Sequence, residues 1–432
     1  MNSKAPAGVR LGPGLHGSVD PTTALILANA EAQLGNVQLT AAESFESLSM
    51  EASEWDGAVE RLGGSIYMTW DWLRTWWAFY GQGCALRVLV FRREGEIIGL
   101  LPLYLQRLGL PPFQLTVARL VGANIPPKVF DPPMDRESTF YCVRMALYYL
   151  EQEGCGVVSL GPVSDEFAIA RSGLEEPGGW LAGWRVGKQR AGVYSWFPLA
   201  ESYEAYLSSL SKNEQKNRRK YELRMLRKKH EVAIEVLGRL GEVLDEAFAE
   251  FVLLHTAQWR SEGLPGHFWA WPHGLEYNRA LVQAQAPHRR VRILRIRADC
   301  ETVSTEYSFA WRDRWFWELP ARKVGPSWDV YSLGPTGLVV MIREAIREGK
   351  KRIEGGLGHY PYKLRLGAVE RPVWIYRFAR GRPGDRVRQW AVQTMRSVIQ
   401  LSYHKMWYRR IQPRLPERWH KPQAWAWLRY DF

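Results

Sequence analysis

The chain has 432 residues, of which 46% are apolar and 24% are charged. This length exceeds that of one ordinary domain and the composition is typical of globular proteins, so we expect two domains with sizeable cores. The formal net charge of +13 favours anionic partners, such as nucleotide cofactors, acidic glycans, nucleic acid or a membrane surface, without choosing among them.

Cysteine spacing and apolar runs argue against several classes of protein. The four cysteines lie far apart without neighbouring histidines, which disfavours both a zinc site and a disulfide scaffold. The longest apolar runs, such as residues 97–105, are much shorter than the roughly 18 residues needed to span a bilayer. Residues 1–36 lack a signal-peptide pattern and are rich in small, turn-forming residues, so we expect them to be disordered. A cytoplasmic protein is expected, either free or peripheral at the inner membrane face.

The first half of the chain, residues 37–199, predicts an α/β domain. Trp70, Leu73 and Trp77 recur at helical spacing, and Gly95 separates two runs of strand-forming residues as in a hairpin. In chain order we expect a helix over 65–80, strands over 86–92 and 96–106, a helix over 135–154, and strands over 156–160 and 185–197.

Residues 200–381 predict a second domain, in which a basic helix precedes the order strand, two helices, three antiparallel strands, helix, strand, strand. In chain order these are the basic helix over 212–229, a strand over 232–236, helices over 243–260 and 275–285, strands over 292–297, 303–311 and 315–320, a helix over 338–348, and strands over 352–358 and 373–379.

A turn rich in Gly, Pro and Ser, residues 331–337, precedes the helix at 338–348. Backbone N–H groups and the positive end of the helix dipole gather at a helix start, so this turn suits a phosphate. We therefore expect cofactor-binding residues at Ser332, Gly334, Thr336 and Gly337. Pro335 supplies no N–H here.

The composition changes after residue 381. Residues 383–432 contain ten Lys or Arg, three Asp or Glu, and five Trp. We expect residues 382–432 to form a basic, Trp-rich region, with a helix over 387–407 and a tail on the protein surface.

Short motifs in both halves resemble one acetyltransferase family. They are Leu-Ser-Lys at 210–212, Arg218-Arg219 with Leu226, His255 with Gln-Trp-Arg at 258–260 and Gly263, Tyr331-Ser332 with Gly334, Tyr362-Lys363, and, in the first half, residues 72–77, 99–103 and Gly122. Over roughly residues 40–380 the chain resembles the CelD/BcsL-type GNAT acetyltransferases, which are associated with cellulose and exopolysaccharide biosynthesis. The resemblance implies tandem GNAT-like domains, as in the FemAB aminoacyltransferases. The implied fold is α/β (α+β), with mixed, largely antiparallel central sheets flanked by helices.

The same resemblance implies an enzyme that moves an acyl group, in the first instance acetyl, to an amine or hydroxyl of a sugar or polysaccharide precursor. Acyl-CoA would be the co-substrate, with no permanently bound cofactor and no metal. The usual GNAT pyrophosphate loop, Arg/Gln-x-x-Gly-x-Gly/Ala, is absent. CoA binding therefore follows from the resemblance and not from a motif.

Acyl transfer needs a base that takes a proton from the nucleophile. Glu306 is a candidate because a carboxylate on an apolar strand has a raised pKa if it is buried; a solvent-facing position is the alternative. Glu318 and Glu354, on later strands, are further candidates. By resemblance, Tyr331 is expected to protonate the leaving thiolate.

Two clusters are expected to bind substrate. His255 and Trp259 share a helix face beside Arg260, which would hold an anionic group; packing alone is the alternative reading of the histidine. His359, Tyr362 and Lys363 follow the Gly-rich strand, where Lys363 would bind a phosphate or sugar acid, or lie solvated in a loop.

Two other functions remain open. One is a FemAB-like aminoacyltransferase that uses aminoacyl-tRNA, the one case in which nucleic acid is an expected partner. The other is a catalytically degenerate GNAT scaffold that docks on a membrane-bound glycosyltransferase complex or an anionic membrane surface through residues 382–432.

Overall fold

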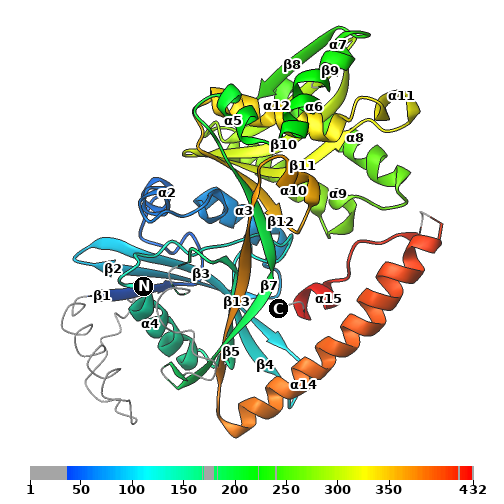
Figure 1. Ribbon diagram of the computed structural model, residues 1–432. Coiled ribbons are helices and arrows are strands. Elements are labelled where there is room, and N and C mark those ends of the chain that lie inside the picture. The colour runs from blue at the N-terminus through cyan, green and yellow to red at the C-terminus, as the bar shows by residue number, and fades with distance from the viewer. Residues whose placement is uncertain are drawn as a thin grey trace.

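The computed structural model describes residues 37–430 except 168, 170–179, 182, 222, 239–240 and 417–418. The disorder expected for residues 1–36 lies outside this range. The strands form one 13-stranded sheet that runs through both halves of the chain, in the order β1-β2-β3-β4-β5-β13-β7-β12-β11-β10-β9-β8, with β6 paired to β7 (Figure 1). Neighbouring strands are antiparallel except in the pairs β4–β5 and β11–β12.

The strands have the following bounds. In residues 37–199 they are β1 (Val37–Ala42), β2 (Ala85–Arg93), β3 (Glu96–Leu108), β4 (Leu115–Leu120), β5 (Val157–Ser164), β6 (Trp180–Leu181) and β7 (Trp184–Pro198). In the remainder they are β8 (Val232–Leu237), β9 (Val291–Ala298), β10 (Glu301–Trp311), β11 (Arg314–Arg322), β12 (Arg352–Leu357) and β13 (Val369–Arg380).

The helices have the following bounds. Those before residue 200 are α2 (Ala52–Arg61), the single 3₁₀ turn η1 (Ile66–Met68), α3 (Trp70–Tyr80) and α4 (Thr139–Gln152). Those of residues 200–381 are α5 (Tyr203–Ser209), α6 (Lys212–Tyr221), α7 (Arg224–Arg227), α8 (Glu242–Ser261), α9 (His267–Ala270), α10 (Gly274–Gln285), α11 (Pro326–Asp329), α12 (Leu333–Arg347) and α13 (Pro361–Arg365). The C-terminal region contains α14 (Pro383–Ile399), the π-helix η3 (Gln400–Ile411), the 3₁₀ turn η4 (Gln412–Arg414) and α15 (Trp425–Tyr430).

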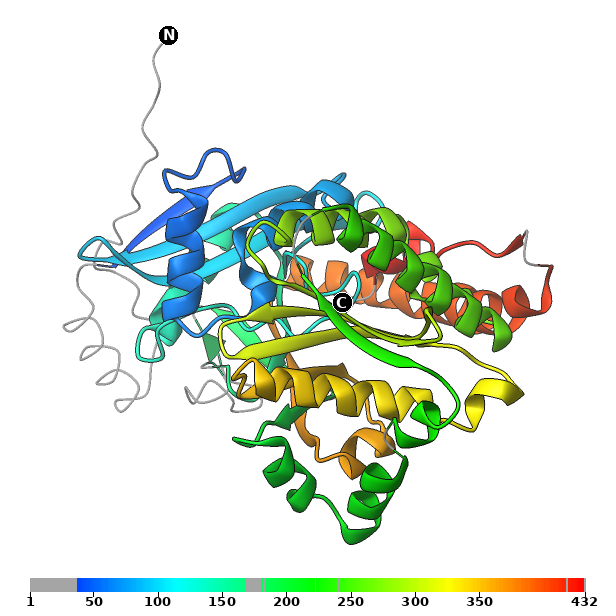
Figure 2. The ribbon, with the colours of Figure 1, turned by 90° about the horizontal axis from the view of Figure 1, so that it is seen from above.

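The mixed, largely antiparallel α/β fold and the element order expected for residues 200–381 are confirmed. Helices α8 and α12 lie on opposite faces of β10 and β11 (Figure 2). The alternation of side chains along β10 explains this arrangement, because Tyr307 packs on Phe248 of α8 whereas Ser308 lies against Met341 of α12.

Several expected boundaries were wrong for local reasons. Helix α12 begins at Leu333 and not at residue 338, so most of the predicted phosphate turn is its first helical turn. The basic helix over 212–229 is two helices, α6 and α7, with Leu223 at a left-handed φ of 51° between them. Lys363, for which a loop was one expectation, lies in the short helix α13 and is buried. Strands β1 and β4 and helix α2 were not predicted.

The last strand of the chain's second half does not stay in that half. β13 lies between β5 and β7, and β7 in turn pairs with β12. Residues 37–199 and 200–381 therefore exchange strands within one sheet. The aromatic core also continues across them, since the Trp72 and Phe309 rings lie 5.0 Å apart and the Tyr80 and Tyr277 rings 5.1 Å apart.

This exchange predicts that a cavity in β13 destabilises both halves together. Phe378 is fully buried in β13, between β5 and β7. Phe378→Ala should lower the free energy of unfolding by about 3–5 kcal/mol, in one cooperative urea transition followed by tryptophan fluorescence. Val369→Ala, at a position 38% exposed in the same strand, is the control and should cost much less. Two separate transitions, or equal losses for the two variants, would contradict the shared core.

Candidate active site

A gap opens between the parallel strands β11 and β12. They pair only at Arg314–Arg352, Trp315–Ile353 and Phe316–Glu354. Beyond these pairs β11 continues alongside β10 to Arg322, whereas β12 turns through Gly356, whose φ is 80°. Among the described residues, no strand pairs with β11 on this side after Phe316. Backbone groups at the start of this unpaired edge can therefore meet a ligand in the gap, whereas Pro320 has no N–H and the Arg322 N–H already donates to Gln258 Oε1.

The side chain of Lys363, from α13, lies at this gap. It is 5% exposed, and its Nζ donates a 2.5 Å hydrogen bond to the Gly355 carbonyl. The ammonium lies 5.0 Å from the centre of the Trp317 ring and 4.5 Å from that of Tyr360, so aromatic faces stabilise its charge. Burial lowers the pKa of Lys363 to about 8. The group is thus mainly a cation at neutral pH, yet it loses its proton far more easily than an ordinary lysine.

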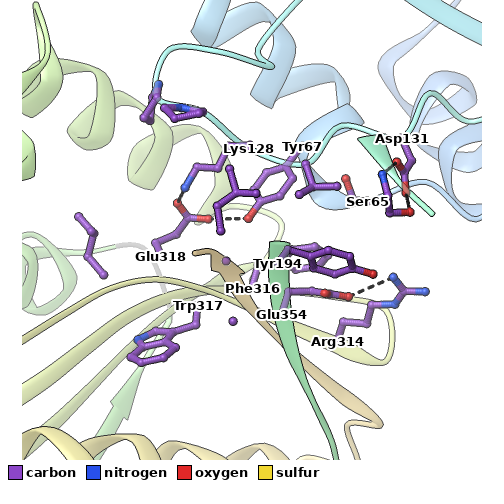
Figure 3. A pocket seen from close by; sticks show the side chains of 18 of the residues that line it. Ser65, Tyr67, Lys128, Asp131, Tyr194, Arg314, Phe316, Trp317, Glu318 and Glu354 are labelled. Atoms are coloured by element: carbon purple, nitrogen blue, oxygen red, sulfur yellow. Dashed lines mark hydrogen bonds and ion pairs between the residues drawn. The ribbon is translucent and has the colours of Figure 1, made fainter. Parts of the chain in front are cut away.

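A cavity of about 720 Å³ adjoins the gap and is lined by both halves of the chain (Figure 3). The first half contributes residues that include Ser65, Tyr67, Lys128, Asp131, Arg136, Glu166 and Tyr194. The second half contributes residues that include Trp259, His267, Trp271, Arg314, Trp317, Glu318, Arg352, Glu354, Tyr360, Tyr362 and Lys363. Its walls therefore combine aromatic surfaces with charges of both signs.

One side of the cavity is closed by a polar contact between the halves. Glu318 is the extra residue of a β-bulge, since Trp317 and Leu319 pair with the consecutive residues Ser308 and Tyr307. Its carboxylate accepts a 2.9 Å hydrogen bond from the Tyr67 hydroxyl and forms an ion pair with Lys128 (Figure 3). Both carboxylate oxygens are thus occupied by first-half side chains.

Glu354 lies on another wall of the cavity, at the last pair before the gap. Its Oε1 is 2.8 Å from Arg352 Nε and 3.2 Å from Arg314 Nη1. Burial raises the pKa of Glu354 in spite of these two guanidinium groups. The Arg352 guanidinium is held in turn, 4.1 Å from the Trp196 ring centre and 3.0 Å from the Tyr194 hydroxyl. Of the catalytic candidates expected from the sequence, Glu354 and Glu318 line the cavity, and Glu354 is the one whose carboxylate is not bound by first-half side chains.

Glu306 lies behind this cavity and does not line it. It is fully buried on the α12 side of β10, where its Oε2 accepts a 2.8 Å hydrogen bond from Trp317 Nε1. Its Oε1 has no hydrogen-bond partner among the described residues and faces Gly337, where a Cβ would come within 2.2 Å of it. Burial raises the pKa of Glu306 well above its usual value. This carboxyl group supports Trp317, which contacts Lys363.

The expected cofactor-binding turn is also outside the cavity lining. Ser332, Gly334, Thr336 and Gly337 belong to the start of α12, and Thr336 is buried. Tyr331 is 7% exposed and its hydroxyl is 3.3 Å from His230 Nε2, away from the cavity. The structure therefore does not bring these residues together with Glu354 and Lys363.

Only some residues of each expected substrate-binding cluster line the cavity. Trp259 lines the cavity, but His255 is fully buried behind it and Arg260 is exposed outside it. His255 Nε2 lies 3.2 Å from Nδ1 of His267, which does line the cavity; burial lowers the pKa of His255 to about 3 and that of His267 to about 4. Tyr362 and Lys363 line the cavity, whereas Nδ1 of the exposed His359 lies 2.9 Å from the Glu370 carboxylate.

Local sequence patterns do not mark the first-half members of this site. Tyr67 lies in an aromatic segment and Lys128 in a proline-rich loop, and neither local pattern marks a site. Pairing of β11 with β12 brings together the side chains of Arg314, Arg352 and Glu354. Because this pairing joins distant parts of the chain, no local pattern predicts the cluster. Within the described ranges, no group of three or more His, Cys, Asp or Glu side chains is placed to hold a metal ion.

The contact between Glu318 and Lys128 predicts a measurable coupling between the halves. Lys128→Met should lower the free energy of unfolding by about 3 kcal/mol, because a buried carboxylate loses its counter-ion. Adding Glu318→Gln to this variant should restore part of that loss in a double-mutant cycle followed by urea denaturation. Strictly additive effects of the two substitutions would contradict a direct interaction.

One family model matches the part of the chain that carries β11, β12 and Lys363. This model, described as "Acetyltransferase (GNAT) domain", matches residues 213–364, which also include α12. No curated protein matches the chain. The crystal structure of FemX is 10% identical and has a TM-score of 0.53, with 76% of this chain and 96% of that chain covered. This likeness supports the fold alone.

Two further solved structures resemble the chain less closely. One is L-PGS from Bacillus licheniformis, at 13% identity and a TM-score of 0.45, with 77% of this chain and 93% of that chain covered. The other is a tandem GNAT protein from the clavulanic acid biosynthesis pathway, at 13% identity and a TM-score of 0.40, with 80% and 99% covered. The match of residues 213–364 to the GNAT acetyltransferase domain model thus stands on that model alone, and these residues include the part of the cavity wall at the gap.

Proposed function

We propose that the protein transfers an acyl group, in the first instance acetyl, from acyl-CoA to an amine or hydroxyl of an acceptor in the cavity. The observation that carries this proposal is the Lys363 ammonium at the gap between β11 and β12. A thioester carbonyl in this gap would meet the cation and the unpaired edge of β11. The match of these elements to a GNAT acetyltransferase domain supports the same chemistry.

In the proposed reaction, Lys363 stabilises the negative charge that develops on the carbonyl oxygen. When the nucleophile attacks the carbonyl carbon, the π electrons of the C=O bond move onto oxygen. The Lys363 ammonium and a β11 N–H group stabilise that oxyanion because they are already in place in a site shielded from bulk water. Collapse of the intermediate reforms the C=O bond and breaks the C–S bond. The leaving thiolate then takes a proton from the Lys363 ammonium.

We propose that Glu354 is the general base, which accepts the proton that the nucleophile loses. It lines the same cavity, and its burial raises its pKa toward the range in which a carboxylate accepts a proton well. The guanidinium groups of Arg352 and Arg314 hold its carboxylate in place. After transfer, protonated Glu354 and neutral Lys363 exchange protons with water, which restores the starting state.

The cavity walls support a sugar or polysaccharide precursor as the acceptor. Tyr67, Tyr194, Trp259 and Trp271 provide aromatic surfaces of the kind that stack on the apolar faces of sugar rings, while charged groups suit hydroxyls and acidic substituents. In this proposal a membrane-bound glycosyltransferase supplies the acceptor. The protein itself acts in the cytoplasm, where acyl-CoA is present.

A second candidate, an aminoacyltransferase that uses aminoacyl-tRNA, is favoured by one specific observation. Pro335 is the third residue of α12 and removes an N–H where a pyrophosphate would bind, and the neighbouring turn residues lie outside the cavity. The net charge of +13 also suits a tRNA. Thermal unfolding separates the candidates: acetyl-CoA should raise the Tm under the first proposal, and only aminoacyl-tRNA should do so under the second.

Replacing Lys363 tests its role directly. Lys363→Met keeps the length of the side chain and removes the charge, so kcat/KM for acyl transfer should fall about 100- to 1000-fold. The fold should be retained because burial of the charge is itself costly. Lys351→Met, at an exposed position before β12, is the matched control and should keep full activity. Equal activity of the two variants would exclude Lys363 from catalysis.

The pKa of Lys363 predicts the alkaline limb of the pH–rate profile. The reaction needs the ammonium form, which is present below the pKa of about 8 and is lost above it. The rate should therefore fall as the pH rises through about 8. In Lys363→Arg the guanidinium stays charged across this range, so any residual activity should lack that limb. An unchanged limb in the arginine variant would assign the titration to another group.

A further inference from the structure

The C-terminal helix has an apolar side that nothing in the described structure covers. Its members are large apolar residues of α14 and η3, which we call the apolar stripe: Val387, Trp390, Val398, Leu401, Met406 and Ile411. Each is between 41% and 70% exposed, with Trp390 the most exposed. In the π-helical part, Leu401, Met406 and Ile411 recur at every fifth residue. The exposed apolar residues therefore continue from α14 into η3.

The opposite side of this helix is firmly attached. Val392 is 1% exposed and packs in a small apolar core with β3, β4 and β5. The Tyr430 hydroxyl lies 2.8 Å from the Met395 sulfur and accepts a 2.9 Å hydrogen bond from the Gly109 N–H. Further along, the His404 ring stacks on Trp427 with ring centres 4.5 Å apart. The stripe thus has a fixed orientation, and the helix lies along one edge of the molecule (Figure 1).

A hairpin tip near the helix is also apolar and exposed. Leu110 and Phe113, in the turn between β3 and β4, are 69% and 48% exposed. This turn approaches the attached side of α14, since a Cβ at Gly109 would lie 3.3 Å from the Val392 side chain. The tip is therefore a separate exposed apolar segment and not a part of the apolar stripe.

The charges of this region have a single sign. Residues 383–414 contain seven basic residues and one acidic residue, Asp385. Asp385 is buried and lies 3.5 Å from both Arg380 and Arg388, so it adds no negative surface. The exposed cations are Arg386, Arg388, Lys405, Arg409, Arg410 and Arg414. The surface is therefore apolar along the stripe and cationic around it.

We propose that the apolar stripe docks on the surface of an anionic phospholipid bilayer. An amphipathic helix with tryptophan on its apolar side and arginine or lysine around it lies in the plane of the membrane interface and is attracted by acidic lipids. The like charges disfavour a second copy of this chain, and a nucleic acid would leave Val398, Leu401 and Met406 without a role. Since no helix in the described part of the chain is long and apolar enough to cross a bilayer, the contact would be peripheral.

Vesicle flotation of the full chain tests this docking. The probes are vesicles of phosphatidylcholine alone and vesicles in which about one third of the lipid is phosphatidylglycerol. We expect the protein to float with the anionic vesicles and not with the neutral ones, and to dissociate as salt is raised. Trp390→Ser/Leu401→Ser should weaken the partition coefficient at least about tenfold. Both positions are exposed, so the Tm should not change.

A matched control removes one Trp and one Leu elsewhere. Leu253→Ser/Trp269→Ser changes residues of α8 and α9 that are 71% and 46% exposed, and it should bind anionic vesicles as the unchanged protein does. A charge variant, Arg409→Gln/Arg410→Gln, should also bind more weakly at low salt. The proposal is overturned if the protein ignores anionic vesicles, if stripe and control variants bind equally, or if the stripe substitutions instead abolish a lipid-independent dimer.

Discussion

Burial of the Lys363 ammonium at the gap between β11 and β12 is the constraint on which the site depends. A buried cation needs hydrogen-bond acceptors and polarisable neighbours, and the Gly355 carbonyl with the Trp317 and Tyr360 rings provides them. That carbonyl is available because β12 leaves the sheet here. Gly355 allows the departure, since a Cβ on it would lie 2.9 Å from the Ser195 backbone oxygen. The Gly-rich strand, the gap and the cation therefore form one arrangement.

The exchange of β7 and β13 gives this arrangement its second wall. Because these two strands lie side by side between β5 and β12, the first half is held against the open end of β11. Tyr67 and Lys128 can then reach the bulged Glu318, and the cavity becomes a property of both halves. The buried Glu306 affects the cavity indirectly. It accepts a hydrogen bond from Trp317, and the Trp317 ring contacts Lys363. Changes at either half are thus expected to alter the geometry at the gap.

Local sequence patterns predicted most of the secondary structure and the order of elements in residues 200–381, because apolar periodicity is a local property. They could not predict the exchange of strands or the partners of Glu318, which depend on contacts between residues far apart in the chain. Residues 331–337 show why local composition can mispredict a helix start. A Gly- and Pro-rich segment before a periodic one suggests a loop, but burial of Leu333 and the contact of Gly337 with Glu306 draw it into the helix. Tyr362-Lys363, singled out by resemblance, lies in the cavity wall, whereas Tyr331, singled out in the same way, does not.

The most direct test is the infrared spectrum of a bound thioester with an isotope-labelled carbonyl. If Lys363 and the edge of β11 polarise that carbonyl, its stretching band should move to lower frequency when labelled acetyl-CoA binds the unchanged protein. The band should return toward its position in water in Lys363→Met, while it stays shifted in Lys351→Met. A carbonyl band that is unshifted on binding, or shifted equally with and without Lys363, would contradict the assignment of the gap as the site of acyl transfer.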